Sequence, residues 1–191
     1  MIKAIFLAAG QSKRLKSENK LNKLYKKTPL INHSLKALQK SKVNKVIIVL
    51  GHEHKKVKKI IKKNKKNIFI YNKNFRKGMA SSIKVGLRKI TRNDKGFIIV
   101  QSDMPFIKTV DINKIFNSIK LKKFLVYVLK FKNKIGNPIG FDISLIKKFK
   151  NIKGEFGAKF MVKRLKNRTK FIRTSTAKSF KDFDKASDFR I

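Results

Sequence analysis

The chain has 191 residues, among which 51 Lys and Arg outweigh 10 Asp and Glu to give a formal charge of +41 at pH 7. This length predicts one domain over residues 1–191 with a single sizeable core. The absence of Cys excludes disulfides and thiolate metal sites, and no apolar stretch approaches the roughly 18–20 residues that a membrane-spanning helix needs. The N-terminus lacks the order of a signal peptide, so we expect a cytoplasmic protein with no membrane partner.

The large positive charge raises the question of nucleic-acid binding. Only eight of the 51 basic residues are Arg, although Arg is preferred for bidentate contacts with phosphates and bases. The lysines are also spread along the whole chain. A compositional bias toward Lys, Asn and Ile therefore explains the charge more simply than a nucleic-acid function does. We expect attraction of anionic substrates and only nonspecific binding to nucleic acid at low salt.

Apolar runs that predict strands alternate with amphipathic segments that predict helices. In chain order we expect a strand at 4–9, a helix at 30–39, a strand at 45–50, a helix around 57–61, a strand at 68–71, a helix at 83–90, a strand at 97–101, a helix at 110–119, and strands at 124–131 and 169–173. This alternation predicts an α/β fold with a mostly parallel central sheet flanked by helices.

Proline and glycine mark several boundaries between these elements. Thr28-Pro29 precedes the first helix, and Met104-Pro105 ends the strand at 97–101. Residues 126–141 contain Gly136-Asn137-Pro138 and predict two extended stretches joined at a turn, at the edge of the sheet.

Ligands of open parallel sheets bind at the carboxyl ends of the strands. Three informative segments follow such strand ends: the loop after Ala9, the loop after Tyr71, and Ser102-Asp103-Met104-Pro105. We therefore expect these segments to form one site, although they lie far apart in the sequence.

The first of these loops has the features of a phosphate site. Gly10 permits close backbone approach, and Lys13, Arg14 and Lys20 carry charges that would neutralise a triphosphate. The loop matches neither the P-loop pattern nor Gly-x-Gly-x-x-Gly. Arg14 is its most informative cation because Arg is rare in this Lys-rich chain.

The other two segments each permit two interpretations. Asp103 is either a Mg²⁺ ligand shared with triphosphate oxygens or a helix N-cap or turn residue before Pro105. Ser81 and Ser82 either cap the helix that follows them or present their hydroxyls to an anionic or ribose-bearing ligand.

Six segments, taken in order, carry a family pattern. They are Leu7-Ala8-Ala9-Gly10-Gln11-Ser12-Lys13-Arg14-Leu15 with Lys20-Leu21, residues 72–87 with Gly78-Met79-Ala80-Ser81-Ser82, Ser102-Asp103-Met104-Pro105, Gly136-Asn137-Pro138, Gly154-Glu155-Phe156-Gly157-Ala158-Lys159, and the tail at 182–189. Their order and spacing resemble those of the nucleotidyltransferases related to molybdenum cofactor cytidylyltransferase. The chain departs from that pattern at Lys16, where the family usually has Gly, and in Glu155 and Lys159, which replace Asp and Arg.

This resemblance implies a Rossmann-like nucleotidyltransferase fold and a Mg²⁺-dependent enzyme. Such an enzyme transfers CMP from CTP to the terminal phosphate of the pterin cofactor molybdopterin and releases pyrophosphate, with a molybdoenzyme as the recipient of the product. Ala9 favours CTP, because Leu-Ala-Ala-Gly is typical of cytidylyl members and Leu-Ala-Gly-Gly of guanylyl members. The alternatives are a related transferase that uses GTP or a sugar phosphate, and a basic nucleic-acid-binding protein.

The resemblance also implies roles for individual residues. Catalysis would fall to Lys20, Arg14 and Asp103. The nucleotide would be bound by Leu7, Ala8, Ala9, Gly10, Arg14, Lys20 and Ser102. The acceptor would be bound by Gly78, Met79, Ser81, Ser82 and Asn137. Mg²⁺ would be held by Asp103, with Asp182 of the altered tail motif as a second ligand.

Overall fold

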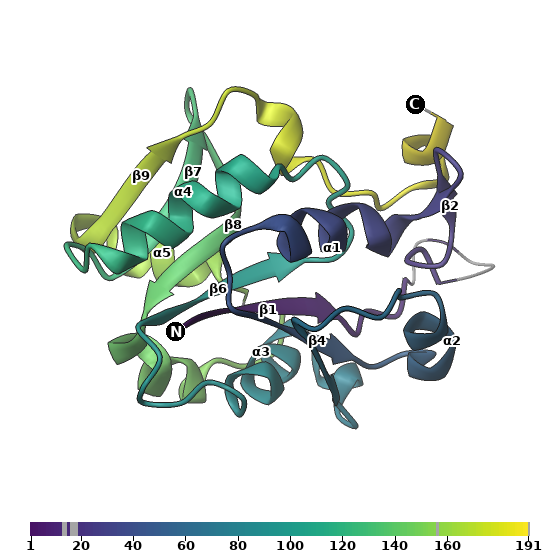
Figure 1. The fold of residues 1–191 in the computed structure, drawn as a ribbon, viewed down its shortest axis with the longest axis horizontal. Coiled ribbons are helices and arrows are strands. Elements are labelled where there is room, and N and C mark those ends of the chain that lie inside the picture. The colour runs from purple at the N-terminus through teal and green to yellow at the C-terminus, as the bar shows by residue number, and fades with distance from the viewer. Residues whose placement is uncertain (13–14, 16–18, 156, 191) are drawn as a thin grey trace.

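A seven-stranded sheet runs through the middle of the computed structural model, which describes residues 1–12, 15, 19–155 and 157–190 (Figure 1). Its strand order is β5-β4-β1-β6-β8-β7-β9. The strands are β1 (Ile2–Ala8), β4 (Lys45–Leu50), β5 (Asn67–Tyr71), β6 (Gly96–Gln101), β7 (Val126–Phe131), β8 (Lys134–Asp142) and β9 (Thr169–Arg173). Neighbouring strands are parallel except at β8, which is antiparallel to both β6 and β7. The predicted α/β fold with a mostly parallel sheet is confirmed.

Helices cover both faces of this sheet. They are α1 (Leu30–Lys40), α2 (His54–Lys59), α3 (Met79–Leu87), α4 (Thr109–Lys120) and α5 (Lys159–Arg164). Short 3-10 helices include η1 (Phe75–Lys77), η2 (Ile143–Asn151) and η4 (Ala177–Phe180), and β2 (Leu24–Tyr25) pairs with β3 (Thr28–Pro29). Among the described residues no helix is long and apolar enough to cross a membrane.

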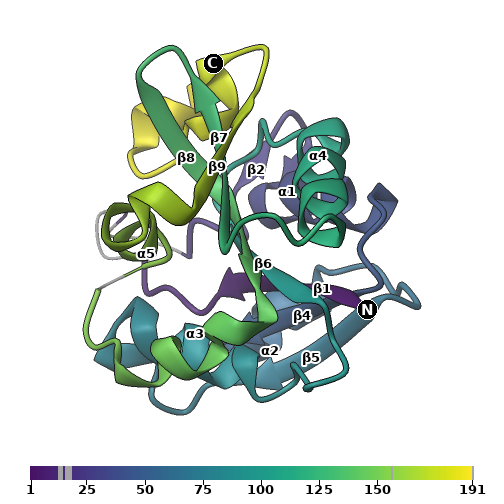
Figure 2. The ribbon, with the colours of Figure 1, turned by 90° about the vertical axis from the view of Figure 1, so that its left-hand side faces the viewer.

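The sheet divides the core into two layers because side chains alternate along each strand. In β1, Ala4 and Phe6 pack on the side of α1, α2 and α4, whereas Ile5 and Leu7 pack on the side of α3, α5 and η2. Figure 2 shows α1 and α4 on one face of the sheet and α3 and α5 on the other. A strand buried on both faces is apolar throughout, which explains the continuous run that predicted β1.

The predicted arrangement of residues 126–141 is wrong in two respects. The turn lies at residues 132–133, and Gly136-Asn137-Pro138 lies inside β8. The hairpin of β7 and β8 is also not at the edge of the sheet. β8 lies between β6 and β7, and β9 forms the edge beyond β7. The register between β7 and β8 shifts after Val128, so residues 137 and 138 form a bulge. A bulge accommodates Pro138, which has no N–H to donate to the sheet.

Candidate active site

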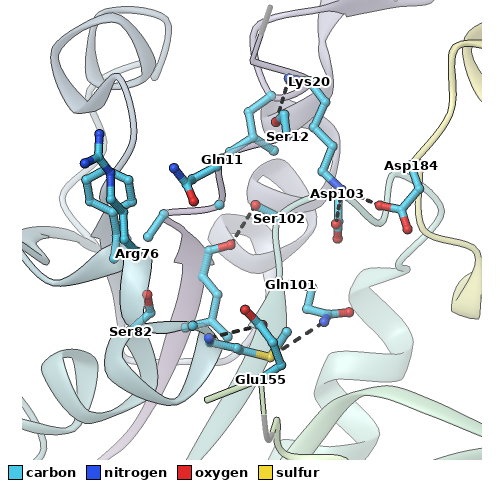
Figure 3. Close-up of a pocket in the computed structure, with 17 residues that line it drawn as sticks. Gln11, Ser12, Lys20, Arg76, Ser82, Gln101, Ser102, Asp103, Glu155 and Asp184 are labelled. Carbon is cyan, nitrogen blue, oxygen red and sulfur yellow. Dashed lines mark hydrogen bonds and ion pairs between the residues drawn. The ribbon is translucent and has the colours of Figure 1, made fainter. Parts of the chain in front are cut away.

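A cavity of about 390 Å³ lies at the carboxyl ends of β1 and β6 (Figure 3). The loop after β1 contributes Leu7, Ala9, Gly10, Gln11, Ser12, Lys20 and Leu21 to its lining. The segment after β5 contributes Phe75, Arg76, Gly78, Met79 and Ser82, and the end of β6 contributes Gln101, Ser102 and Asp103. Glu155 and Asp184 complete the lining. The three segments predicted to converge therefore do so.

Lys20 lies between two carboxylates in this cavity. Its Nζ donates to Asp103 Oδ2 at 2.6 Å and to Asp184 Oδ1 at 2.7 Å. The three side chains are 14%, 18% and 31% exposed, respectively, so water screens these ion pairs less than it screens pairs on the surface. The second oxygen of Asp103, Oδ1, is buried and has no hydrogen-bond partner among the described residues.

Local hydrogen bonds fix where Lys20 enters the cavity. The backbone N–H of Lys20 donates to Ser12 Oγ at 3.0 Å, and the N–H of Leu21 donates to Asn19 Oδ1 at 3.1 Å. Ser12 Oγ also donates to Asn19 Oδ1 at 3.3 Å. These contacts join the two ends of the loop between residues 12 and 19, and they place the Lys20 side chain toward Asp103.

Burial and ion pairing shift the pKa values of Asp103 and Lys20. Burial raises the pKa of the Asp103 carboxyl above its ordinary value, and the charge and hydrogen bond of Lys20 oppose this shift without cancelling it. Burial alone would lower the pKa of Lys20, but the carboxylates of Asp103 and Asp184 outweigh it and raise that pKa. Lys20 is therefore held as an ammonium.

Asp184 reaches the cavity because an aromatic cluster anchors the tail. Phe183 is fully buried, with its ring centroid 4.9 Å from that of Tyr25 and 5.7 Å from that of Phe106. Its backbone N–H donates to the carbonyl oxygen of Asp103 at 2.9 Å. The predicted metal ligand Asp182, on the other side of Phe183, is exposed and does not line the cavity, although its charge contributes to the raised pKa of Asp103.

The N-terminus of α3 forms a second wall of the cavity. Gly78 has φ +90, and a Cβ at that position would lie 2.5 Å from the carbonyl oxygen of Gly154. The backbone N–H of Met79 donates to Glu155 Oε2 at 3.3 Å, so the loop around residue 155 packs against this helix end.

Neither the two serines nor Asp103 caps a helix, although Asp103 does lie in a turn, as its second interpretation allowed. Gly78 occupies the N-cap position of α3, so Ser81 and Ser82 lie within the helix, and the N-cap of α4 is Lys108, not Asp103. Asn72 Nδ2 donates to both serine hydroxyls, at 2.9 and 3.0 Å. Ser82 lines the cavity, whereas Ser81 lies outside its lining.

The remaining predicted residues differ in how directly they meet the cavity. Leu7, Ala9 and Gly10 line it, whereas Ala8 is buried in the core on the α1 side. Ser102 lines it, but its hydroxyl donates to the carbonyl oxygen of Leu7 at 2.7 Å and so joins β6 to β1. Arg14 lies outside the described residues, as does Lys16.

Sequence reasoning missed three polar residues of the lining. Asp184 lies two positions after Asp182, and the apolar Phe183 between them was the available signal that this segment is anchored. Gln101 is only the last residue of a predicted strand in the sequence, and no motif marks it as part of a site. Arg76, whose guanidinium lies 5.8 Å from the centroid of the Phe75 ring, follows β5 in the same segment as Gly78.

The donor set fits a hard divalent cation. Asp103 and Asp184 present carboxylate oxygens to one point, and that point carries a positive charge, the Lys20 ammonium. Oxygen ligands and one or two carboxylates are what Mg²⁺ and Mn²⁺ take in sites that also bind phosphates. Among the described residues there is no cluster of three or more His, Cys, Asp or Glu that would form a closed metal cage.

Comparisons with known proteins show which family model and which relatives this chain matches. Residues 4–169 match the MobA-like NTP transferase domain. The bifunctional protein GlmU of Clostridioides difficile (strain 630) is 30% identical over 141 residues, which cover 73% of this chain and 29% of that protein. The 2-C-methyl-D-erythritol 4-phosphate cytidylyltransferase of Lachnoclostridium phytofermentans is 33% identical over 145 residues, or 70% of this chain and 58% of that protein. The chain thus spans less than a third of that GlmU protein and just over half of that cytidylyltransferase.

Solved structures share the fold at low sequence identity. Rv0371c of Mycobacterium tuberculosis H37Rv superposes with a TM-score of 0.85 at 19% identity, over 99% of this chain and 95% of that one. A complex of the same protein with manganese gives a TM-score of 0.75 at 16% identity, over 91% and 87% of the two chains. These likenesses show a common fold, and manganese is a ligand of that protein.

Proposed function

The chain belongs to the family of MobA-like NTP transferase domains, and on this basis we propose that it is a nucleotidyltransferase dependent on a divalent metal. The reaction we propose is the transfer of CMP from CTP to the terminal phosphate of molybdopterin, with release of pyrophosphate. The observation that carries the proposal is the Lys20 ammonium between two carboxylates in a cavity with a glycine-containing rim.

Each part of the cavity suits one part of the nucleotide. Gly10 is exposed at the rim, and nothing lies within 4 Å of the place that a Cβ would take, so the backbone is open to phosphates. Leu7, Ala9 and Phe75 offer apolar surface to a base. Lys20 offers a positive charge to the triphosphate, and Arg14 would add another from the same loop. This division supports the assignment of the β1 side of the cavity to the nucleotide.

The proposed reaction requires that the protein position the two substrates and neutralise the charge of their phosphates. An oxygen of the acceptor phosphate attacks the α-phosphorus, the bond between that phosphorus and the oxygen leading to the β-phosphorus breaks, and pyrophosphate leaves with the electron pair. A phosphate monoester is ionised at neutral pH, so no general base is required. Lys20 neutralises charge on the phosphates and holds the reacting groups in line.

A divalent cation would be held by Asp103 and Asp184. When bound, it would supply charge neutralisation at the phosphate oxygens and orient the leaving pyrophosphate. The burial of Asp103 and its unpartnered Oδ1 support this assignment, because a carboxylate oxygen left without a partner is costly unless a ligand reaches it. The manganese complex of Rv0371c supports a divalent metal in a protein of the same fold.

CTP is favoured over other nucleotides by Ala9 within Leu-Ala-Ala-Gly, and by the similarity to a 2-C-methyl-D-erythritol 4-phosphate cytidylyltransferase. That similarity also makes a polyol phosphate the acceptor to test beside the pterin. GTP and a sugar phosphate are the further alternatives.

The test is a panel of pyrophosphate-release assays. Each NTP is incubated with Mg²⁺ or Mn²⁺ and with molybdopterin, 2-C-methyl-D-erythritol 4-phosphate, a sugar 1-phosphate or no acceptor. We expect release with CTP and molybdopterin, and none in an Asp103→Asn variant. Release with GTP or with another acceptor would replace the proposed substrates, and a folded wild-type protein that releases pyrophosphate with no pair would refute the function.

A further inference from the structure

Gln101 presents an amide to the cavity from the end of β6. It pairs in register with Leu7 of β1, and both residues line the cavity. Its Oε1 accepts a hydrogen bond of 2.8 Å from Asn137 Nδ2, and its Nε2 lies 4.0 Å from Met79 Sδ. A thioether is a weak acceptor, so the Nε2 hydrogens of Gln101 remain available to a ligand.

Asn137 contacts the Gln101 amide from outside the cavity. It is only 7% exposed and does not line the cavity, so a ligand in the cavity meets Gln101 rather than Asn137. Its Oδ1 is buried and has no hydrogen-bond partner among the described residues. The bulge at residues 137–138 takes Asn137 out of the pairing with β7, and bulges commonly re-aim a side chain next to an active site. Gln101 is the one hydrogen-bond partner of the Asn137 side chain among the described residues.

The surroundings of Gln101 differ from those of Lys20. Met79 lies between Gln101 and Glu155, because its Sδ faces the amide and its N–H donates to the Glu155 carboxylate. Figure 3 shows Gln101 and Glu155 on the side of Asp103 away from the rim that carries Gln11 and Ser12. A carboxylate accepts hydrogen bonds and repels anions. This end of the cavity therefore suits a group that offers an acceptor to the Gln101 N–H and a donor to the Glu155 carboxylate, as a hydroxyl can do.

The Lys20 end and the Gln101 end of the cavity suit the two substrates of an in-line transfer, the nucleotide and the acceptor. The nucleotide side of the cavity is built from the loop after β1 and from Phe75, whereas Gln101 is tied through Asn137 to β8 in the other half of the sheet. The acceptor must approach the α-phosphorus from the side opposite the leaving pyrophosphate. Gln101 and Glu155 lie where the body of that acceptor would rest.

We propose that Gln101 is a recognition residue for the acceptor and that Asn137 is a positioning residue that acts through it. The acceptor, beyond its reacting phosphate, carries at this place an oxygen or ring nitrogen that accepts from Gln101 Nε2 and an O–H or N–H that donates to Glu155, as a polyol or a pterin can, and no second anionic group. This inference rests on the proposed nucleotidyl transfer, and it moves Asn137 from the direct acceptor contact that its motif implied to a supporting position.

The experiment compares Gln101→Leu, Asn137→Ala and the double variant. The probes are CTP with Mn²⁺, for which the Kd is measured by calorimetry, and the acceptor that the wild type uses in the panel above, for which the KM is measured. We expect Gln101→Leu to raise the acceptor KM about tenfold, as the loss of one hydrogen bond would, and to change the Kd for CTP less than twofold. Asn137→Ala should raise the acceptor KM in the wild type but not in the Gln101→Leu background.

A matched control is available on α1. Gln39 Nε2 donates to Asn67 Oδ1 at 3.2 Å, so Gln39→Leu removes the same kind of contact outside the cavity and should leave both constants unchanged. The proposal is overturned if Gln101→Leu weakens CTP binding fivefold or more, if it leaves the acceptor KM unchanged, or if Asn137→Ala still raises that KM in the Gln101→Leu background. A wild type that neither binds CTP nor releases pyrophosphate would instead refute the proposed function itself.

Discussion

Replacing Lys20 by Met removes the ammonium that lies between the Asp103 and Asp184 carboxylates and keeps most of the side chain's volume. The ion pairs are short, at 2.6 and 2.7 Å, and their groups are largely but not fully buried. Removing one partner costs about 3–5 kcal/mol in a buried pair and about 0–1 kcal/mol in an exposed one. We expect an intermediate loss of about 2 kcal/mol in the free energy of unfolding at pH 7.

A divalent cation should reverse this loss. In Lys20→Met the Lys20 ammonium no longer competes with a cation for these carboxylate oxygens, so Mn²⁺ should bind more tightly in the absence of nucleotide than it binds to the wild type. A ligand at 100 times its Kd stabilises the folded state by about 2.7 kcal/mol, which is enough to offset the substitution. We therefore expect Mn²⁺ to raise the urea midpoint of the variant by about 1 M, and to raise that of the wild type by less.

Urea denaturation followed by far-UV circular dichroism measures both effects, because the chain has no Trp to report by fluorescence. Lys56→Met is the matched control, since Lys56 pairs with Glu53 at 2.6 Å but is 74% exposed, and its midpoint should not change. Equal midpoints for the two variants, or a Lys20→Met variant that is indifferent to Mn²⁺, would refute the reasoning.

The pH dependence of Lys20→Met adds a further check. The folded-state pKa of Lys20 is raised above 10.5, so its stabilising contribution is fully present below about pH 10.5 and is lost as pH rises through the folded-state pKa. The difference between wild type and variant should therefore be constant from pH 7 to 9 and shrink in more alkaline buffer.

Four further substitutions test other parts of the molecule. Asp103→Asn should lower pyrophosphate release by more than about a hundredfold and leave the circular dichroism spectrum unchanged. Substituting residues that only support metal ligands already lowers metal affinity or activity 10–100-fold, and Asp103 is proposed as a direct ligand. Asp94→Asn breaks a buried ion pair with Lys3 and should lower the free energy of unfolding, measured in urea, by about 3 kcal/mol. Because the pKa of Asp94 is lowered below 3.8, that difference should hold above pH 3.8 and vanish as pH falls through the folded-state value. Gly78→Ala places a Cβ 2.5 Å from a backbone oxygen at φ +90 and should destabilise the fold by about 1–3 kcal/mol. Gly10→Ala, whose Cβ meets nothing within 4 Å, should leave the unfolding midpoint unchanged.

The N-terminal half of the fold was predictable because its signals are local. The apolar runs at β1, β4 and β6 and the apolar face of α1 identify these elements from a few adjacent residues. The hairpin of β7 and β8 was not predictable in the same way. Its turn contains Lys132 at φ +50 and no Gly or Pro, whereas the strong turn signals of Gly136-Asn137-Pro138 lie inside β8, at and beside the bulge of residues 137–138. Helix α5, with only six residues, gave no clear periodicity.

The residues of the candidate site also differ in whether local sequence signals predict them. Lys20, Asp103 and Ser82 follow strand ends or begin a helix, and topology alone brought them together in the prediction. Asp184 could not be placed, because its position depends on the packing of Phe183 against aromatic residues from distant parts of the chain. Gln101 has no motif of its own, and only the contact with Asn137 distinguishes it from any other strand end.

The ion pairs of Lys20 join positions that are very far apart in the sequence. Asp103 lies 83 residues from Lys20, and Asp184 lies 164 residues away. Contacts that close such long loops carry an entropic cost that must be met before they stabilise the chain, so we expect these ion pairs to form late in folding. A partly folded chain that has assembled only β1, β4 and β5 would hold the glycine rim but neither carboxylate. Tight binding of a fluorescent nucleotide analogue with metal would therefore report that the whole chain has folded, and it would distinguish the native protein from compact intermediates of similar helix content.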